Sequence, residues 1–193
     1  MPSVQRTAHP KSMPPLENEM KVSYVALNQQ EKKCIDERLR VRLNRFIAAT
    51  DVKVSCTAGN VLIVGDRPGP SAPLDPEYHH TPFYSTKHCS GWLNAALHLA
   101  NIPEDRLVWI NSADRNGNST DTSIIKRVKP DIIICLGGNA VKWVKGAINA
   151  SGKFCEFYKF DHPQFHKRFK NSEEYPLLAF LCSYFSVKDL NRL

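Results

Sequence analysis

The sequence lacks the long apolar segments that a membrane-spanning protein needs. Its longest apolar runs, Val61–Val64 and Ile132–Leu136, fall far short of the ~20 residues of a transmembrane helix. The N-terminus holds no apolar stretch of the kind found in export signals. We therefore expect a protein of the cytoplasm with no membrane partner, and of the host cytoplasm if a phage encodes it.

The cysteines lack the paired spacing of a metal site. There is no C-x-x-C pair and no finger-type combination with histidine. In a chain without an export signal we expect reduced and mostly buried thiols. We predict no metal and no other cofactor. The six cysteines are Cys34, Cys56, Cys89, Cys135, Cys155 and Cys182.

Signatures of several other α/β enzymes are missing as well. The loop Gly65–Pro70 lacks the third glycine of a dinucleotide fingerprint and the Gly-Lys-Ser/Thr of a phosphate-binding loop. No G-x-S-x-G elbow of a serine hydrolase occurs. These absences disfavour a generic nucleotide-binding protein and a serine hydrolase.

What the sequence does contain is the composition of a globular protein with excess positive charge. Its 193 residues are 42% hydrophobic and carry 26 Lys and Arg against 19 Asp and Glu, a net charge of +7. This length suits one compact domain with its own core. We predict a poorly ordered, proline-rich arm over residues 1–20 and a single domain over residues 21–193. The charge favours a polyanionic partner.

Short apolar runs alternate with amphipathic segments along this domain. We expect strands at 61–64, 107–110, 131–136 and 154–160, and helices at 28–49, 90–100, 122–128 and 139–149. The alternation predicts an α/β fold, a three-layer α/β/α sandwich around a short, mainly parallel four-stranded sheet. On the first helix we interpret six basic residues as a solvated face: Lys32, Lys33, Arg38, Arg40, Arg42 and Arg45.

Ligands of such sheets bind beyond the carboxyl ends of the strands, and polar loop residues cluster there. Six short motifs follow one another in a fixed order. They are Gly65-Asp66-Arg67-Pro68-Gly69, Pro82-Phe83, Ser90-Gly91-Trp92-Leu93-Asn94, the strand-end Asn111, Leu136-Gly137-Gly138-Asn139-Ala140 and His162-Pro163.

The order of these motifs resembles the uracil-DNA glycosylase superfamily, and most of all its branch with G-E-x-P-G and H-P motifs. The resemblance spans residues 61–165. It implies a uracil-DNA glycosylase-like fold, DNA as the partner, and an enzyme that flips a pyrimidine out of the stack into a pocket.

The resemblance also implies a role for each matched residue. Phe83 would stack on the flipped base, and Gly65 would let the base approach closely. Asn111 would read the Watson–Crick edge, and His162 would hydrogen-bond the pyrimidine O2. Taken singly, Phe83 is equally well a core residue, whereas a turn residue is the better interpretation of Asn111 and a structural histidine that of His162.

The segment after His162-Pro163 matches the DNA-entering loop of the superfamily. Its basic side chains would bind phosphates and one of its phenylalanines would fill the gap left by the base. Without the resemblance, the same run is equally well a solvated surface. The segment contains Phe165, His166, Lys167, Arg168, Phe169 and Lys170.

The sequence departs from that branch in two ways. Arg67 stands where glycosylases usually carry Asp or Asn to hold or activate water, and a guanidinium cannot act as a general base. Asp66 keeps a carboxylate one residue earlier. The four cysteines that bind the iron–sulfur cluster of the branch have no counterpart with that spacing here.

Two enzyme hypotheses follow, and the first is slightly favoured. It is an amino acid:DNA transferase, similar to those of thymine hypermodification in phages. A free amino acid would displace pyrophosphate from an activated 5-hydroxymethyluracil. Arg67 would bind the carboxylate or pyrophosphate, and Asp66, His80 or His88 would take the proton.

The alternative is a DNA glycosylase that excises uracil or a modified pyrimidine. Asp66 would position water or stabilise the sugar cation, and His162 would stabilise the departing base. A third hypothesis is a catalytically inactive, DNA-binding member of the fold. The presence of both Asp66 and His162 speaks against it.

Overall fold

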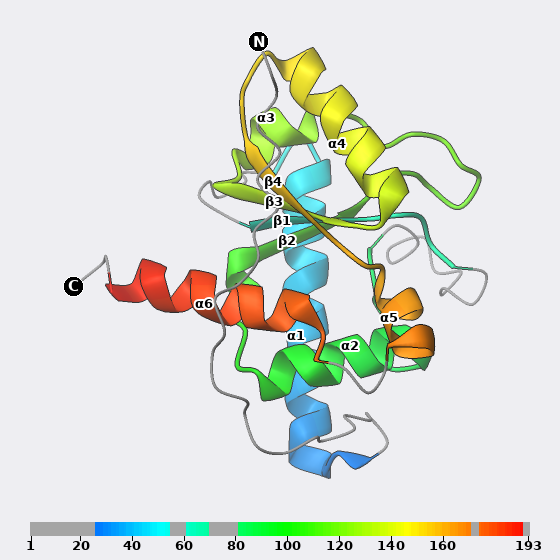
Figure 1. Ribbon diagram of the computed structural model, residues 1–193, viewed down its shortest axis with the longest axis vertical. Helices are drawn as coiled ribbons and strands as arrows, with labels where there is room; N and C mark the ends of the chain where they lie inside the picture. The colour runs from blue at the N-terminus through cyan, green and yellow to red at the C-terminus, as the bar shows by residue number, and fades with distance from the viewer. Residues whose placement is uncertain (1–25, 55–60, 70–80, 171–173, 191–193) are drawn as a thin grey trace.

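A computed structural model of the protein describes residues 26–54, 61–69, 81–170 and 174–190 (Figure 1). At its centre is a four-stranded sheet with the strand order β2-β1-β3-β4 and parallel pairing throughout. The strands are β1 (Val61–Gly65), β2 (Leu107–Asn111), β3 (Ile132–Leu136) and β4 (Glu156–Phe160). The first three are buried along their whole length, as strands covered on both faces are. The predicted parallel sheet is confirmed.

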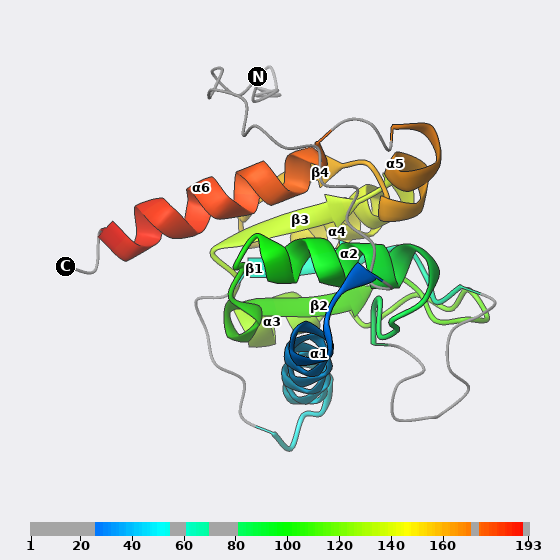
Figure 2. The ribbon, with the colours of Figure 1, turned by 90° about the horizontal axis from the view of Figure 1, so that it is seen from below.

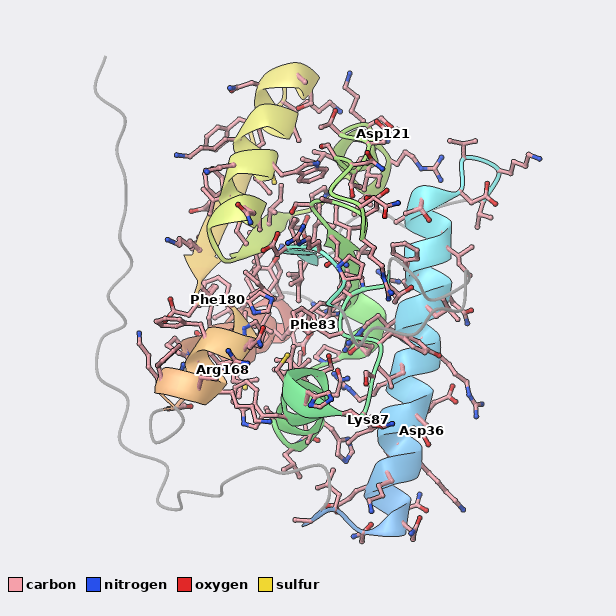
Figure 3. The ribbon with its side chains drawn as sticks, turned by 90° about the vertical axis from the view of Figure 1, so that its right-hand side faces the viewer. Asp36, Phe83, Lys87, Asp121, Arg168 and Phe180 are labelled. Atoms are coloured by element: carbon pink, nitrogen blue, oxygen red, sulfur yellow. The ribbon has the colours of Figure 1, made fainter. Side chains whose placement is uncertain are left out.

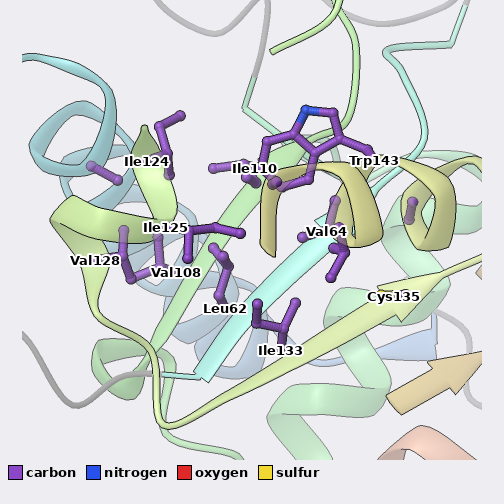
Figure 4. Packing of buried hydrophobic residues seen from close by; sticks show 14 residues of the cluster. Leu62, Val64, Val108, Ile110, Ile124, Ile125, Val128, Ile133, Cys135 and Trp143 are labelled. Carbon is purple, nitrogen blue, oxygen red and sulfur yellow. The ribbon is translucent and has the colours of Figure 1, made fainter. Parts of the chain in front are cut away.

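Helices cover both faces of this sheet, which confirms the three-layer sandwich. Figure 1 shows α3 (Ile124–Val128) and α4 (Gly138–Ser151) above the strands, and α2 (His88–Leu99) and α6 (Pro176–Leu190) below them. The side chains of α3 and α4 form one core with alternate residues of β1, β2 and β3 (Figure 4). The other residues of the same strands form a second core with α2 and α6.

Helix α1 (Gln29–Thr50) runs past the edge strand β2 and so reaches both layers (Figure 2). It begins with a capping box, in which Asn28 and Glu31 each accept from the backbone N–H of the other. Ile35 packs with α2, while Ala49 belongs to the core under α3 and α4. A helix that contacts the protein on two sides buries more than one narrow stripe of its surface.

This packing overturns the prediction of a solvated basic face for part of α1. Arg42 is fully buried, Arg38 is largely buried, and Arg45 donates from Nε to the carbonyl of Leu107 at 2.8 Å. Lys33 and Arg40 do face solvent. The helical pattern in the sequence reveals the apolar stripe of α1. It does not reveal that Glu104 and the carbonyl of Leu107 lie next to that stripe and bind its arginines.

Two helices in the last part of the chain were not predicted. The short helix α5 (Pro163–Phe169) occupies the segment expected to be a DNA-facing loop. Helix α6 packs Leu177, Leu181 and Phe185 against the sheet. None of the described helices is both long and apolar enough to cross a membrane.

The thiols are less buried than predicted. Among the described cysteines none forms a disulfide, but only Cys135 is buried, and the other four are half-exposed. Cys56, the arm over residues 1–20, Pro70 and His80 lie outside the described residues. The single domain over residues 21–193 stays a prediction.

Candidate functional site

The carboxyl ends of β1 and β2 bring three of the predicted site residues together. Gly65 is the register partner of Asn111. A Cβ atom added to Gly65 would lie 2.6 Å from Oδ1 of Asn111 and 3.6 Å from Cε2 of Phe83. The side chains of Asn111 and Phe83 therefore both stand over Gly65, and this close approach requires a residue without a side chain. The carbonyl of Asn111 accepts from Oγ1 of Thr120 at 2.6 Å, which fixes the strand end.

Phe83 is held in an unusual backbone conformation. Its φ of 53° lies in the left-handed region, which few residues other than glycine adopt. Its ring packs edge-on against Trp109, at 5.9 Å between centroids, and lies 5.6 Å from the imidazole of His162. In Figure 3 it lies near the centre of the view, between Arg168 of α5 and Lys87. The ring therefore borders the place where the ends of β1, β2 and β4 converge.

The motif Ser90-Gly91-Trp92-Leu93-Asn94 docks the segment that carries Phe83. A Cβ atom on Gly91 would come within 2.2 Å of the carbonyl oxygen of Thr86, so only glycine lets this backbone lie on α2. Nδ2 of Asn94 donates to the carbonyls of Phe83 at 3.0 Å and of Ser85 at 2.9 Å. The motif was visible in the sequence, but its structural role was not. The groups that Asn94 binds are backbone carbonyls, and these leave no mark in the sequence.

The Asp66 carboxylate is fixed by a residue that had no predicted role. Nδ2 of Asn139, in the first turn of α4, lies 3.0 Å from each carboxylate oxygen of Asp66. The carbonyl of Asp66 accepts from Oγ of Ser112 at 2.7 Å and from the N–H of Ala113 at 3.1 Å. Both the backbone and the side chain of Asp66 are therefore held at the strand ends.

His162 follows β4 and caps α5. Its Nδ1 accepts from the backbone N–H of Gln164 at 3.2 Å. Burial lowers the pKa of His162, while the nearby charge of Asp66 opposes this shift. The imidazole is therefore neutral at pH 7 and carries its proton on Nε2, because Nδ1 is the acceptor. The site thus holds one N–H donor and one carboxylate.

No described residue fixes the side chain of Arg67 beside these groups. Its side chain is exposed and forms no hydrogen bond or ion pair within the part of the chain that the structure describes. His88, one of the predicted proton acceptors, is exposed at the start of α2, and its carbonyl accepts from Nζ of Lys167 at 3.3 Å.

Helix α5 presents two aromatic rings and several cations to solvent. Phe165 is 46% and Phe169 is 71% exposed, and their ring centroids lie 5.0 Å apart. Lys167 and Arg168 are exposed, while Lys170 forms an ion pair with Asp161 at 2.8 Å. We call Phe165, Lys167, Arg168, Phe169 and Lys170 the α5 surface.

His166 does not belong to the α5 surface. Its side chain is 1% exposed and stacks on Trp92 at 5.8 Å between centroids, with Tyr175 at 4.7 Å on another side. The helical turn of α5 directs this side chain inward, whereas the prediction treated the segment as a loop. The structure therefore does not bring His166 to the surface of the protein.

Comparison with known proteins gives likenesses among solved structures alone. No family model matches the sequence, and no curated protein matches it. Among solved structures, the chain is similar to wild-type SMUG2 from Pedobacter heparinus. The two are 16% identical, the likeness covers 72% of this chain and 78% of that chain, and the TM-score is 0.42. At this degree of similarity, the function rests on the site itself.

Proposed function

We propose that the protein is a DNA glycosylase that excises uracil or a modified pyrimidine. The observation that carries the proposal is the pairing of two groups at one sheet end. The Asp66 carboxylate is fixed by Asn139, and the neutral His162 has an Nε2–H available for donation.

These two groups suit the two charges that develop when a glycosidic bond breaks. The sugar becomes cationic, and the Asp66 carboxylate stabilises it and positions the water that adds to C1′. The base departs with negative charge on its O2, to which Nε2–H of His162 donates. Preoriented groups stabilise such charges without reorganisation, which is how they lower the barrier.

The neighbouring side chains suit recognition of a flipped base. The ring of Phe83 offers a face on which a pyrimidine stacks, and the amide of Asn111 offers both donors and an acceptor to its edge. The α5 surface offers cations for the phosphates and exposed rings to fill the gap in the duplex. The net charge of +7 agrees with DNA as the partner.

The amino acid:DNA transferase is the second candidate. The exposed guanidinium of Arg67 is suited to a carboxylate or a pyrophosphate. However, no described residue holds Arg67, whereas both carboxylate oxygens of Asp66 are held. Excision depends on the fixed group and transfer depends on the unfixed one, so we rank excision first.

The test is mass spectrometry of the products from two DNAs. One contains uracil and hydroxymethylated pyrimidines, and the other carries pyrophosphorylated 5-hydroxymethyluracil with a pool of amino acids supplied. We expect free base and alkali-labile abasic sites. A heavier nucleoside with an intact glycosidic bond would establish the transferase instead, and DNA binding without either product would leave an inactive DNA-binding protein.

A variant of Asp66 shows whether this site is responsible for base release. Asp66→Asn keeps the shape but removes the charge, and we expect it to lower base release by roughly 100-fold or more. The matched control is Asp36→Asn, since Asp36 is an exposed carboxylate on α1, far from the strand ends in Figure 3. Equal rates for the two variants would remove Asp66 from the mechanism.

A further inference from the structure

An arginine on α1 is buried in full beneath the segment that carries Phe83. Arg42 donates from Nε to Oε1 of Glu104 at 2.7 Å and from Nη2 to Oε2 at 3.1 Å. Its guanidinium carbon lies 4.2 Å from the centre of the Trp109 ring. Glu104 also accepts from Nη2 of Arg38 at 2.9 Å. One carboxylate therefore compensates two arginines inside the protein.

Stability alone is a poor explanation for such a pair. The loss of hydration on burying two charges offsets much of their attraction, and apolar residues of similar volume often serve as well. What the pair does provide is a guanidinium with a defined orientation. The planar fork on Glu104 uses Nε and Nη2 of Arg42, and Nη1 is directed elsewhere.

Nη1 of Arg42 reaches the backbone next to the proposed base-stacking ring. It lies 3.3 Å from the carbonyl oxygen of Phe83 and 3.4 Å from that of Pro82. The carbonyl of Phe83 thus accepts from two side chains, Arg42 of α1 and Asn94 of α2. Trp109 provides a second connection between Arg42 and Phe83. The guanidinium of Arg42 stacks on the indole ring, and the ring of Phe83 packs against it.

A left-handed residue outside regular structure needs such support. Residues other than glycine with left-handed backbone angles are strained. They keep this conformation only where contacts with the surrounding protein impose it. The segment over residues 81–87 has no helix or strand of its own. Beside a local hydrogen bond from the N–H of Ser85 to the carbonyl of Phe83 at 2.9 Å, its conformation is held by contacts with α1, α2 and Trp109 of β2.

We propose that Arg42 is a positioning residue for base recognition. By holding the carbonyl of Phe83, it keeps the phenyl ring against His162, where a flipped base would stack. The base-stacking role of the Phe83 ring rests on the proposed function. The contact between Arg42 and the carbonyl of Phe83 does not depend on it. Asn94 also donates to the carbonyl of Phe83, and Glu104 orients the guanidinium of Arg42 toward that carbonyl.

The variant that tests the proposal is Arg42→Lys, which keeps a positive charge beside Glu104 but loses the fork. The matched control is Arg38→Lys, because Arg38 pairs with the same carboxylate and touches neither Pro82 nor Phe83. We expect Arg42→Lys to lower kcat/KM for base release by about 10- to 100-fold, as displacement of a positioning contact does. Arg38→Lys should stay within about 2-fold, since it removes no positioning contact.

A double-mutant cycle separates positioning from a general loss of stability. If Arg42 acts through the ring of Phe83, Arg42→Lys has no further effect on base release once Phe83→Ala has been made. If the double variant instead loses the product of the two single-variant fold-losses in base release, the proposal is overturned. Asn94→Ala removes the other donor and is expected to give the same non-additive result. The cycle can therefore be run on Asn94 if Arg42→Lys does not fold.

Hydrogen exchange gives a readout that needs no activity. We expect faster exchange of the amides over residues 81–87 in Arg42→Lys than in Arg38→Lys, at equal thermal stability. Unchanged exchange there would overturn the positioning role. If the wild-type protein releases no base from any DNA, the proposed function fails, and the exchange measurement still decides the role of Arg42.

Discussion

Replacement of Gly65 by alanine tests the geometry at the centre of the site. The new Cβ atom would lie 2.6 Å from Oδ1 of Asn111, whereas real Cβ atoms essentially never approach closer than 3.0 Å. The amide oxygen must therefore retreat by at least 3.0 − 2.6 = 0.4 Å. The backbone of Asn111 cannot follow, because it is paired with Gly65 and bonded to Thr120. The side chain has to rotate out of its place.

The cost of this change can be worked out in two parts. Overpacking costs about 1–3 kcal/mol of unfolding free energy, and the lower entropy of the unfolded alanine chain returns about 0.4–1 kcal/mol. We expect a net loss of roughly 0–2.6 kcal/mol, toward the lower end because the displaced atom is the end of a side chain. For base release, a displaced amide leaves a polar edge of the base unpaired, which costs about 1–3 kcal/mol, or about 5- to 150-fold in kcat/KM.

Gly146→Ala is the matched control. Gly146 is exposed within α4, and a Cβ atom there would have no heavy atom within 4 Å. Alanine should raise the unfolding free energy by about 1 kcal/mol through helix propensity and leave base release unchanged. Urea unfolding and base-release kinetics measure both variants. A Gly65→Ala protein with wild-type stability and wild-type kcat/KM would refute the close approach of Asn111 over Gly65.

Two further predictions concern His162 and Phe169. Burial lowers the pKa of His162 below its usual 6.5, so the unfolded chain binds the proton more readily. The unfolding free energy should therefore fall as the pH drops from 6.5 to the folded pKa, and His162→Gln should flatten this stretch in urea titrations. Phe169 is exposed, so Phe169→Ala should change stability by at most about 0.5 kcal/mol. It should slow base release from duplex DNA more than from single strands, and equal losses on both would contradict a wedge.

The sheet was predictable because its strands carry a local signal. Three short runs of β-branched and apolar residues are buried on both faces, and each is followed by glycine or polar residues. The order of the motifs also led to Gly65, Phe83, Asn111 and His162, which the structure brings to one end of the sheet. Their roles on DNA stay predictions.

The groups that hold these residues were not predictable in the same way. Arg42 and Glu104 are 62 residues apart, and nothing on α1 distinguishes a buried arginine from an exposed one. His166 was assigned to a DNA-facing loop because the segment after His162-Pro163 resembles that loop of the superfamily, but one helical turn directs it inward. Tertiary partners decide both cases, and a one-dimensional pattern does not contain them.

The same reasoning changes the weight of Arg67. In the sequence it was the decisive departure, since it replaces the residue that would hold water. In the structure the carboxylate one position earlier is the one that a neighbour orients, because Asn139 in the first turn of α4 donates to both of its oxygens. For a carboxylate to act in catalysis, its orientation in the folded protein matters more than its exact position in the sequence motif. What holds Asp66 therefore bears more directly on excision than the identity of residue 67.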